Sequence, residues 1–174
     1  MSISEKRRTQ LLAGPYTRLL AEHEGAVADF YATLARAVTG AKDFWKDLAK
    51  EELMHRIQID RVADKMVKGE WRFQRPPYQV ATVADSIEWL NSRRHHVEQD
   101  GISMRDALKA AMEVETNMIE ADFFAIVDRD SPTMMEALTS QAINTRSHIK
   151  RIQHEARRLK WRIFGGRLKR PKGP

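Results

Sequence analysis

The chain contains no cysteine, and this absence excludes disulfides, thiolate zinc sites, iron–sulfur clusters and cysteine nucleophiles. Any metal ion that the protein binds must therefore be held by histidine, aspartate and glutamate, a ligand set that suits iron, manganese or zinc better than soft ions. Long apolar runs are also lacking, since none approaches the roughly 20 residues that a membrane-spanning helix needs. Because the opening residues contain no apolar segment of signal-peptide length either, we expect a cytoplasmic protein.

Acidic residues are missing from the last part of the chain, residues 157–174, which holds eight cations. The whole chain of 174 residues has a net charge of +6, so residues 1–156 by themselves carry a net charge of −2. The basic character therefore belongs to a tail and not to the rest of the protein. We expect one domain at residues 1–156, which is long enough to bury a core, and a basic tail at residues 157–174.

Apolar residues recur at helical spacing in four long segments, which predicts four α-helices. The predicted helices cover residues 5–39, 41–68, 104–128 and 132–161. Thr39 and Gly40 separate the first two helices, and Ser131 followed by Pro132 is a typical start for the fourth. Because the first and second helices, and likewise the third and fourth, are joined by short links, we expect two antiparallel hairpins.

The connection between the two hairpins is long, and its proline pair at 76–77 excludes a regular helix over residues 69–82. A shorter helix is predicted at residues 83–98, with Thr82 opening a capping box at its start, and Ser103 is predicted to cap the third long helix in the same way. Two hairpins joined by one long crossover are typical of ferritin-like bundles rather than of simple up-down bundles. We therefore expect an all-α, ferritin-like four-helix bundle.

Five acidic and histidine side chains interrupt the apolar stripes of the four predicted helices. Glu52 and His55 are three residues apart, so they share one face of a helix. That face is otherwise apolar, and a carboxylate there is costly to bury unless it is paired or binds a cation. Glu24, Glu115 and His148 stand in similar positions on the other three helices. A divalent ion would neutralise the carboxylates and use the imidazoles as neutral donors, so the pattern predicts a metal site built from these five residues.

Each of these residues also has a purely structural interpretation. In this interpretation Glu24 and Glu115 are solvated surface residues, and His148 is a core histidine bonded to a helix carbonyl. The Glu-x-x-His motif of Glu52 and His55 is a chance match. The metal interpretation is favoured because the spacing recurs in both hairpins. In the first hairpin, Glu52 follows Glu24 by 28 residues and His55 comes three residues later. In the second, Thr145 follows Glu115 by 30 residues and His148 comes three residues later.

The sequence resembles the rubrerythrin-like branch of the ferritin-like superfamily at these positions. Glu24 with Tyr31 seven residues later resembles the first-helix pattern of that family. The run at residues 50–55 (KEELMH) resembles its second-helix ligand motif, and residues 110–115 (AAMEVE) resemble the start of the repeat in its third helix. The resemblance covers about residues 10–155.

The resemblance implies two metal ions between the hairpins. Glu24 would be a terminal ligand of one ion and Glu115 its counterpart on the other. Glu52 would bridge the ions, and His55 and His148 would complete one ion each. Members of the family react ferrous iron with dioxygen or peroxide, so the resemblance implies iron as the cofactor, with manganese and zinc as alternatives.

The sequence departs from the family pattern in its fourth helix and in its lack of cysteine. The second bridging glutamate should stand at position 145, where this chain has Thr145. Asp122 takes the place that corresponds to Tyr31, but it lies two turns, roughly 10 Å, from Glu115 along a helix. Gln141 is another possible neutral donor, and Tyr31, Asp122 and Thr145 are further possible site residues. Without cysteine the chain has no rubredoxin-type iron, so redox turnover requires an external electron donor.

These observations favour an iron-dependent redox protein with ferroxidase or peroxidase-like activity in iron or oxidative-stress handling. The alternative is a degenerate bundle that binds one metal ion or none and serves as a scaffold or a regulator. The expected partners are a second copy of the chain in a homodimer and an anionic partner, nucleic acid or a membrane surface, for the tail at 157–174. A helix end followed by a solubilising tail is the alternative for these basic residues.

Overall fold

The computed structural model describes residues 3–70, 80–117, 146–159, 162–164 and 167–169. The described elements are helices α1 (Ile3–Ala37), α2 (Lys42–Val67), α3 (Val80–Asp100) and α4 (Met104–Thr116), a helical segment at 146–158, and strands β1 (Arg162–Phe164) and β2 (Arg167–Lys169). The helices make up nearly all of the described residues, so the all-α class is correct for everything in these ranges except the short β-hairpin.

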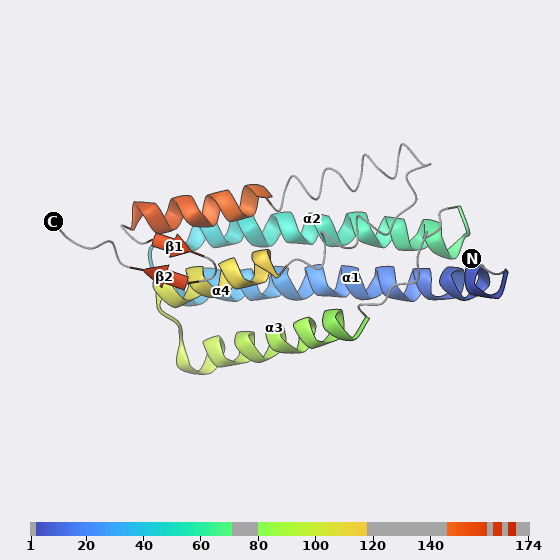
Figure 1. Ribbon diagram of the computed structural model, residues 1–174. Helices are drawn as coiled ribbons and strands as arrows, with labels where there is room; N and C mark the ends of the chain where they lie inside the picture. The colour runs from blue at the N-terminus through green and yellow to red at the C-terminus, as the bar shows by residue number, and fades with distance from the viewer. Residues whose placement is uncertain (1–2, 71–79, 118–145, 160–161, 165–166, 170–174) are drawn as a thin grey trace.

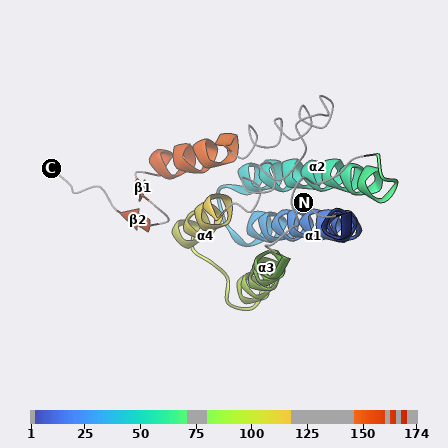
Figure 2. The same cartoon turned by 45° about the vertical axis from the view of Figure 1, so that its right-hand side comes forward.

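Helices α1 and α2 lie side by side and run in opposite directions in both ribbon views (Figure 1, Figure 2). The link between them is short, and Gly40 adopts a φ of 87° there, a conformation that glycine takes without steric cost. At the other end of the pair, a Cβ atom on Gly14 would lie only 2.8 Å from Cγ2 of Val67. The predicted first hairpin is therefore confirmed, with the two helices in close contact along their length.

Helix α3 packs against α1 (Figure 2), and it begins earlier than the sequence predicted. The helix starts at Val80, so Thr82 lies inside its first turn and is not the N-cap. The predicted capping box at Thr82 is therefore wrong. Because a cap contributes only about 1 kcal/mol, a favourable capping sequence does not prevent a helix from extending by further main-chain hydrogen bonds.

The predicted N-cap of α4 at Ser103 is confirmed. The hydroxyl of Ser103 accepts a hydrogen bond of 3.1 Å from the backbone N–H of Asp106, and it donates one of 2.6 Å to the carboxylate of the same residue. Helix α4 ends at Thr116, whose hydroxyl donates to the carbonyl of Met112 at 2.5 Å and so competes with the helical main-chain bonds. Residues 118–128 of the predicted third helix lie outside the described residues, as do residues 132–145 of the predicted fourth.

One hydrophobic core draws on α1, α2, α3, α4 and the helical segment 146–158. Its large, fully buried side chains come mainly from α1 and α2, and the other elements close the core around them. Among its members are Phe30, Tyr31, Leu34, Trp45, Leu48, Leu90, Val97, Leu108, Ala111 and Ile152. Apart from Phe30 and the two α3 residues Leu90 and Val97, these residues occupy the predicted apolar stripes, so helical spacing identified the core faces of the other elements correctly.

The C-terminal residues contain a structure that the all-α prediction did not include. The helical segment ends at residue 158 rather than 161, and β1 pairs with β2 in antiparallel register, Ile163 opposite Leu168. The overlooked signal was the Gly-Gly pair at 165–166 between two short runs, since such a pair is typical of a β-hairpin. The prediction of a separate domain at 1–156 and a tail at 157–174 is not tested by these elements.

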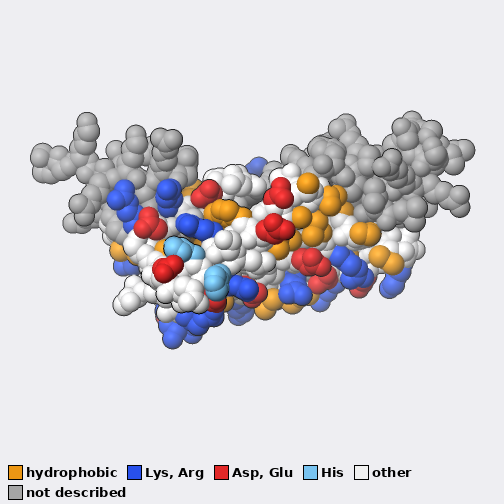
Figure 3. Space-filling model, turned by 90° about the horizontal axis from the view of Figure 1, so that it is seen from below, with side chains coloured by type: hydrophobic (Ala, Val, Ile, Leu, Met, Phe, Trp, Pro, Cys, Tyr) orange, Lys and Arg blue, Asp and Glu red, His pale blue; other side chains and the backbone are white. Residues whose placement is uncertain are grey.

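The surface of the helical part carries charges of both signs. Figure 3 shows one face on which acidic and basic side chains are intermingled with apolar ones. This mixture agrees with the small net charge of residues 1–156. Within the described ranges, no helix has both the length and the apolar character that crossing a membrane requires.

Candidate metal centre

Five acidic and histidine side chains are buried among the helices. Helix α1 supplies Glu24, α2 supplies Glu52 and His55, α4 supplies Glu115, and the segment 146–158 supplies His148. Their exposed fractions lie between 0% and 5%. The interpretation of Glu24 and Glu115 as solvated surface residues is therefore wrong, and the interior must compensate three carboxylates.

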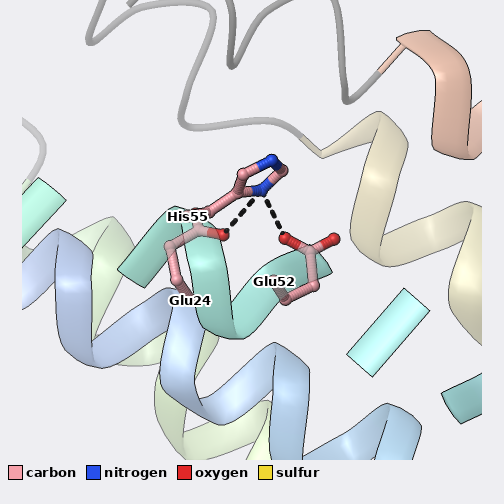
Figure 4. A group of neighbouring side chains, drawn as sticks. All are labelled: Glu24, Glu52 and His55. Carbon is pink, nitrogen blue, oxygen red and sulfur yellow. Dashed lines mark hydrogen bonds and ion pairs between the residues drawn. The ribbon is translucent and has the colours of Figure 1, made fainter. Parts of the chain in front are cut away.

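The first group consists of Glu24, Glu52 and His55, whose side chains point toward one another (Figure 4). Nδ1 of His55 lies 2.8 Å from Oε2 of Glu52 and 3.7 Å from Oε2 of Glu24. One donor atom from each residue falls within 4.8 Å of the others. Three oxygen and nitrogen donors at such distances form a group that is able to hold a metal ion.

The second group consists of Glu52, Glu115 and His148, again with one donor atom from each residue within 4.8 Å of the others. Nδ1 of His148 lies 2.8 Å from Oε1 of Glu52 and 3.3 Å from Oε1 of Glu115. The rings of His55 and His148 stack with their centroids 5.5 Å apart. Glu52 thus belongs to both groups, with Oε2 facing the first and Oε1 facing the second.

The ring nitrogen Nδ1 of His148 makes no aligned hydrogen bond although it is buried. Two carboxylate oxygens are near enough for an ion pair, but their directions do not satisfy hydrogen-bond geometry. A buried polar atom without such a bond is costly. Its placement among carboxylate oxygens fits a ring nitrogen that donates its lone pair to a metal ion better than one that completes a hydrogen-bond network.

The pKa values of the central groups respond to burial and to one another. Burial raises the pKa of the Glu52 carboxyl to about 7, although the nearby His148 and His55 act to lower it. Burial acts to lower the pKa of each histidine, but the neighbouring carboxylates outweigh it and raise the pKa of His55 to about 9 and that of His148 to about 11. Without a metal ion, imidazolium groups therefore neutralise part of the carboxylate charge.

Tyr31 supports the second group from α1. Its hydroxyl donates a hydrogen bond of 2.7 Å to Oε1 of Glu115, and the ring contacts Trp45 with a centroid distance of 6.0 Å. Burial, and next the negative charges of Glu115 and Glu52, hold the pKa of the phenol well above its usual value. Tyr31 was predicted as an additional site residue, and the structure places it as a donor to Glu115 at the edge of the group.

Two neighbours of the groups were not identified from the sequence as site residues. Glu51 accepts a hydrogen bond of 2.8 Å from Nε2 of His148 and also contacts the guanidinium of Arg151. The sequence did offer one sign of this contact: Arg151 stands three residues after His148, so the two side chains share a helical face on which a carboxylate could bind both. On α1, His23 lies 2.9 Å from the hydroxyl of Ser86 and 3.9 Å from Glu24.

The remaining predicted site residues, Asp122, Gln141 and Thr145, lie outside the described residues. Their roles stay predictions. Because Thr145 stands where the family pattern has a bridging glutamate, a second ion would have one ligand fewer. A count of bound metal ions tests whether that ion still binds.

A pocket of about 270 Å³ adjoins the first group on the α2 side. Its lining residues are Asp47, Lys50, Glu51, Met54, His55 and Gln58. Because His55 lines this pocket and also faces Glu24 and Glu52, only this side chain separates the pocket from the buried carboxylates.

No protein-family model matches the chain, and no match was found among curated proteins or solved structures. The resemblance to rubrerythrin-like proteins therefore rests on the sequence motifs alone, and the family stays a prediction. The geometry adds that two buried Glu/His groups could bind a metal ion, without indicating which one.

Proposed function

We propose that the chain is a metal-binding protein of the ferritin-like type, with one iron ion in each of the two groups that share Glu52. The observation that carries this proposal is the convergence of three buried carboxylates and two histidines from four helical segments. Glu24, Glu52 and His55 would hold one ion, while Glu52, Glu115 and His148 would hold the other. The two-hairpin arrangement of ferritin-like bundles is part of the same proposal, because such bundles place metal sites between facing helices.

The donor set fits a pair of divalent ions. Carboxylate oxygens and imidazole nitrogens bind iron, manganese and zinc, and three carboxylates would offset most of the charge of two such ions. Nδ1 of His148, buried without an aligned hydrogen bond, would gain a partner. The protons that the raised pKa values keep on His55 and His148 would leave when the ions bind.

The proposed activity is that of an oxidoreductase, a ferroxidase or peroxidase acting on dioxygen or peroxide. Bound iron would supply the electron transfer, and the protein residues would position and enclose it. Tyr31 orients Glu115 through its hydrogen bond, and the pocket beside His55 offers room for a small oxidant. An external electron donor would have to restore the reduced state, since the chain has no cysteine to hold a second redox centre.

The first experiment is a metal count on protein purified without chelator and then loaded anaerobically with ferrous iron. Wild-type protein should bind two iron ions per chain, and ferric absorption should appear when oxygen is admitted. Glu52→Ala should remove both ions, because Glu52 contributes to both groups. Glu22→Ala, which changes an exposed glutamate of the same helix as Glu24, serves as the control and should leave the count at two. Wild-type protein that binds no metal would refute the proposal.

The second candidate function is a scaffold or regulator that binds one metal ion or none. Two observations favour it: the chain has Thr145 where the family has a bridging glutamate, and the histidines already neutralise carboxylates in the metal-free protein. Thermal unfolding with and without added ferrous or manganous ions separates the candidates. An unchanged melting temperature at saturating metal would favour a scaffold that binds no ion, because an ion that binds only the folded state must stabilise it.

A further inference from the structure

Glu51 lies on the outer side of His148, away from the proposed metal position. Its Oε2 is 2.8 Å from Nε2 of His148, whereas Nδ1 of the same ring faces Glu52 and Glu115. The two nitrogens of the ring thus have different neighbours, one carboxylate outside the second group and two carboxylates inside it.

The contact with Glu51 selects the tautomer of the ring. A carboxylate only accepts hydrogen bonds, so Nε2 must carry the proton that bonds to Glu51. In a neutral imidazole the lone pair is then left on Nδ1, the nitrogen that points into the second group. A metal-ligating histidine commonly donates its other N–H to a carboxylate, which fixes ring orientation and strengthens the donor nitrogen.

Glu51 is itself held in place. Its second oxygen, Oε1, accepts a hydrogen bond from Arg151, which stands three residues after His148 on the segment 146–158. Each oxygen of the carboxylate therefore has its own donor on that segment. The side chain of Glu51 remains 42% exposed, so its position is explained by these two contacts and not by burial in the core.

We propose that Glu51 is a positioning residue, which with Arg151 fixes the ring of His148 so that Nδ1 is the nitrogen offered to the metal ion of the second group. This inference rests on the proposed function. Glu51 itself makes no contact with the ion. Because His148, the residue that Glu51 contacts, belongs only to the second group, a change at position 51 should affect the second ion and not the first.

The test uses full-length protein and cobalt(II) as the probe, titrated in the absence of other metals and followed by visible absorption and by a bound-metal count. Glu51→Ala should weaken one of the two ions about 10- to 100-fold, the usual cost of losing such a partner, and leave the other unchanged. Glu51→Gln retains an acceptor oxygen and should restore most of the lost affinity. Asp43→Asn, an exposed carboxylate eight residues earlier on α2, is the control and should change neither ion.

A spectroscopic readout separates positioning from a general loss of structure. In protein loaded with zinc, nitrogen-15 NMR of the histidine side chains should show His148 with its proton on Nε2 and a metal-bound Nδ1. In Glu51→Ala the Nε2 proton should exchange faster with water, while the spectrum of His55 stays the same.

The outcomes distinguish this inference from the proposed function. Two ions bound to Glu51→Ala with wild-type affinity, or a His148 ring that is bound through Nε2, would overturn the role of Glu51 while the metal site stands. Equal weakening of both ions would also overturn it, because the effect would not be specific to His148. Wild-type protein that takes up no cobalt would overturn the proposed function and this inference together.

Discussion

The two groups share Glu52, yet the chain assembles them in different ways. The first group lies within the hairpin of α1 and α2, so one short link brings Glu24 close to His55. The second group joins α2 to α4 and to the segment 146–158, which are distant in sequence, and it has outer partners in Tyr31 and Glu51. The comparison indicates that local chain geometry builds one half of the site, while the other half depends on the complete tertiary structure.

The largest expected effect separates the two groups directly. Glu24→Gln should remove the ion of the first group, and Glu115→Gln should remove the ion of the second. Losing one partner of a buried charge costs about 3–5 kcal/mol, which corresponds to a loss of affinity on the order of 100- to 4,000-fold. Cobalt(II) titration should therefore find one tight ion in each single variant and none in the double variant.

Glu22→Gln provides the control, since Glu22 is an exposed carboxylate on α1. It should keep both ions. If either single variant loses both ions at once, the two groups are one indivisible site, and the comparison between them fails.

The pH dependence of stability should change direction when metal is bound. In the metal-free protein the pKa values of His55 and His148, about 9 and about 11, lie above the unfolded value of roughly 6.5. Both stabilise the folded state fully below the unfolded pKa; the contribution of His55 is lost as pH rises through about 9, and that of His148 as pH rises through about 11. Each contribution falls on the order of 2 kcal/mol between pH 7 and 9, so the free energy of unfolding should fall by about 4 kcal/mol over this range.

Urea unfolding in chelator, repeated with excess zinc, measures this effect. Metal-loaded protein carries no proton on these donor atoms, so its stability should rise with pH to roughly 6.5 and then level off. His55→Asn should reduce the slope of the metal-free protein by about half, because His148 still contributes, and His95→Asn, which changes an exposed histidine of α3, should leave the slope unchanged. A metal-free protein whose stability does not change between pH 7 and 9 would contradict the assigned pairing.

Tyr31→Phe should have a smaller effect that is confined to the second group. The change removes the hydroxyl that donates to Glu115 and should lower the free energy of unfolding by about 1–2 kcal/mol, because a buried acceptor loses its donor. Binding of the first ion should not change. The control is Tyr16→Phe, which changes a buried tyrosine eight residues before Glu24 on the same helix. If Tyr31→Phe weakens both ions equally and Tyr16→Phe weakens neither, the two groups are coupled through α1.

The basic tail should have the smallest effect on the metal groups and a separate effect on anionic partners. Truncation after Trp161 removes most of the cations of residues 157–174. Full-length protein should bind DNA or anionic vesicles with an affinity that falls as salt is raised, and the truncated protein should lose this binding while it keeps two metal ions. Binding that survives truncation would place the anionic contact on the helical part instead.

Helical spacing predicted much of the structure correctly. It identified the buried faces of α1, α2 and α4, and it placed Glu52 with His55 on one face of α2. It did not reveal the early start of α3 at Val80, because cap preferences are weak beside main-chain hydrogen bonds. The β-hairpin of the tail was overlooked although its Gly-Gly signal was present in the sequence.

The amino-acid sequence by itself determined which side chains face the interior, because an α-helix repeats every 3.6 residues and an acid within an apolar stripe must follow that stripe inward. Only the tertiary structure decided which of these side chains meet. The division into two groups around Glu52, the hydrogen bond from Tyr31 to Glu115, and the contact of Glu51 with His148 all depend on how separate helices are aligned. Periodicity within one helix carries no information about that alignment, since it is fixed by the packing of the whole core.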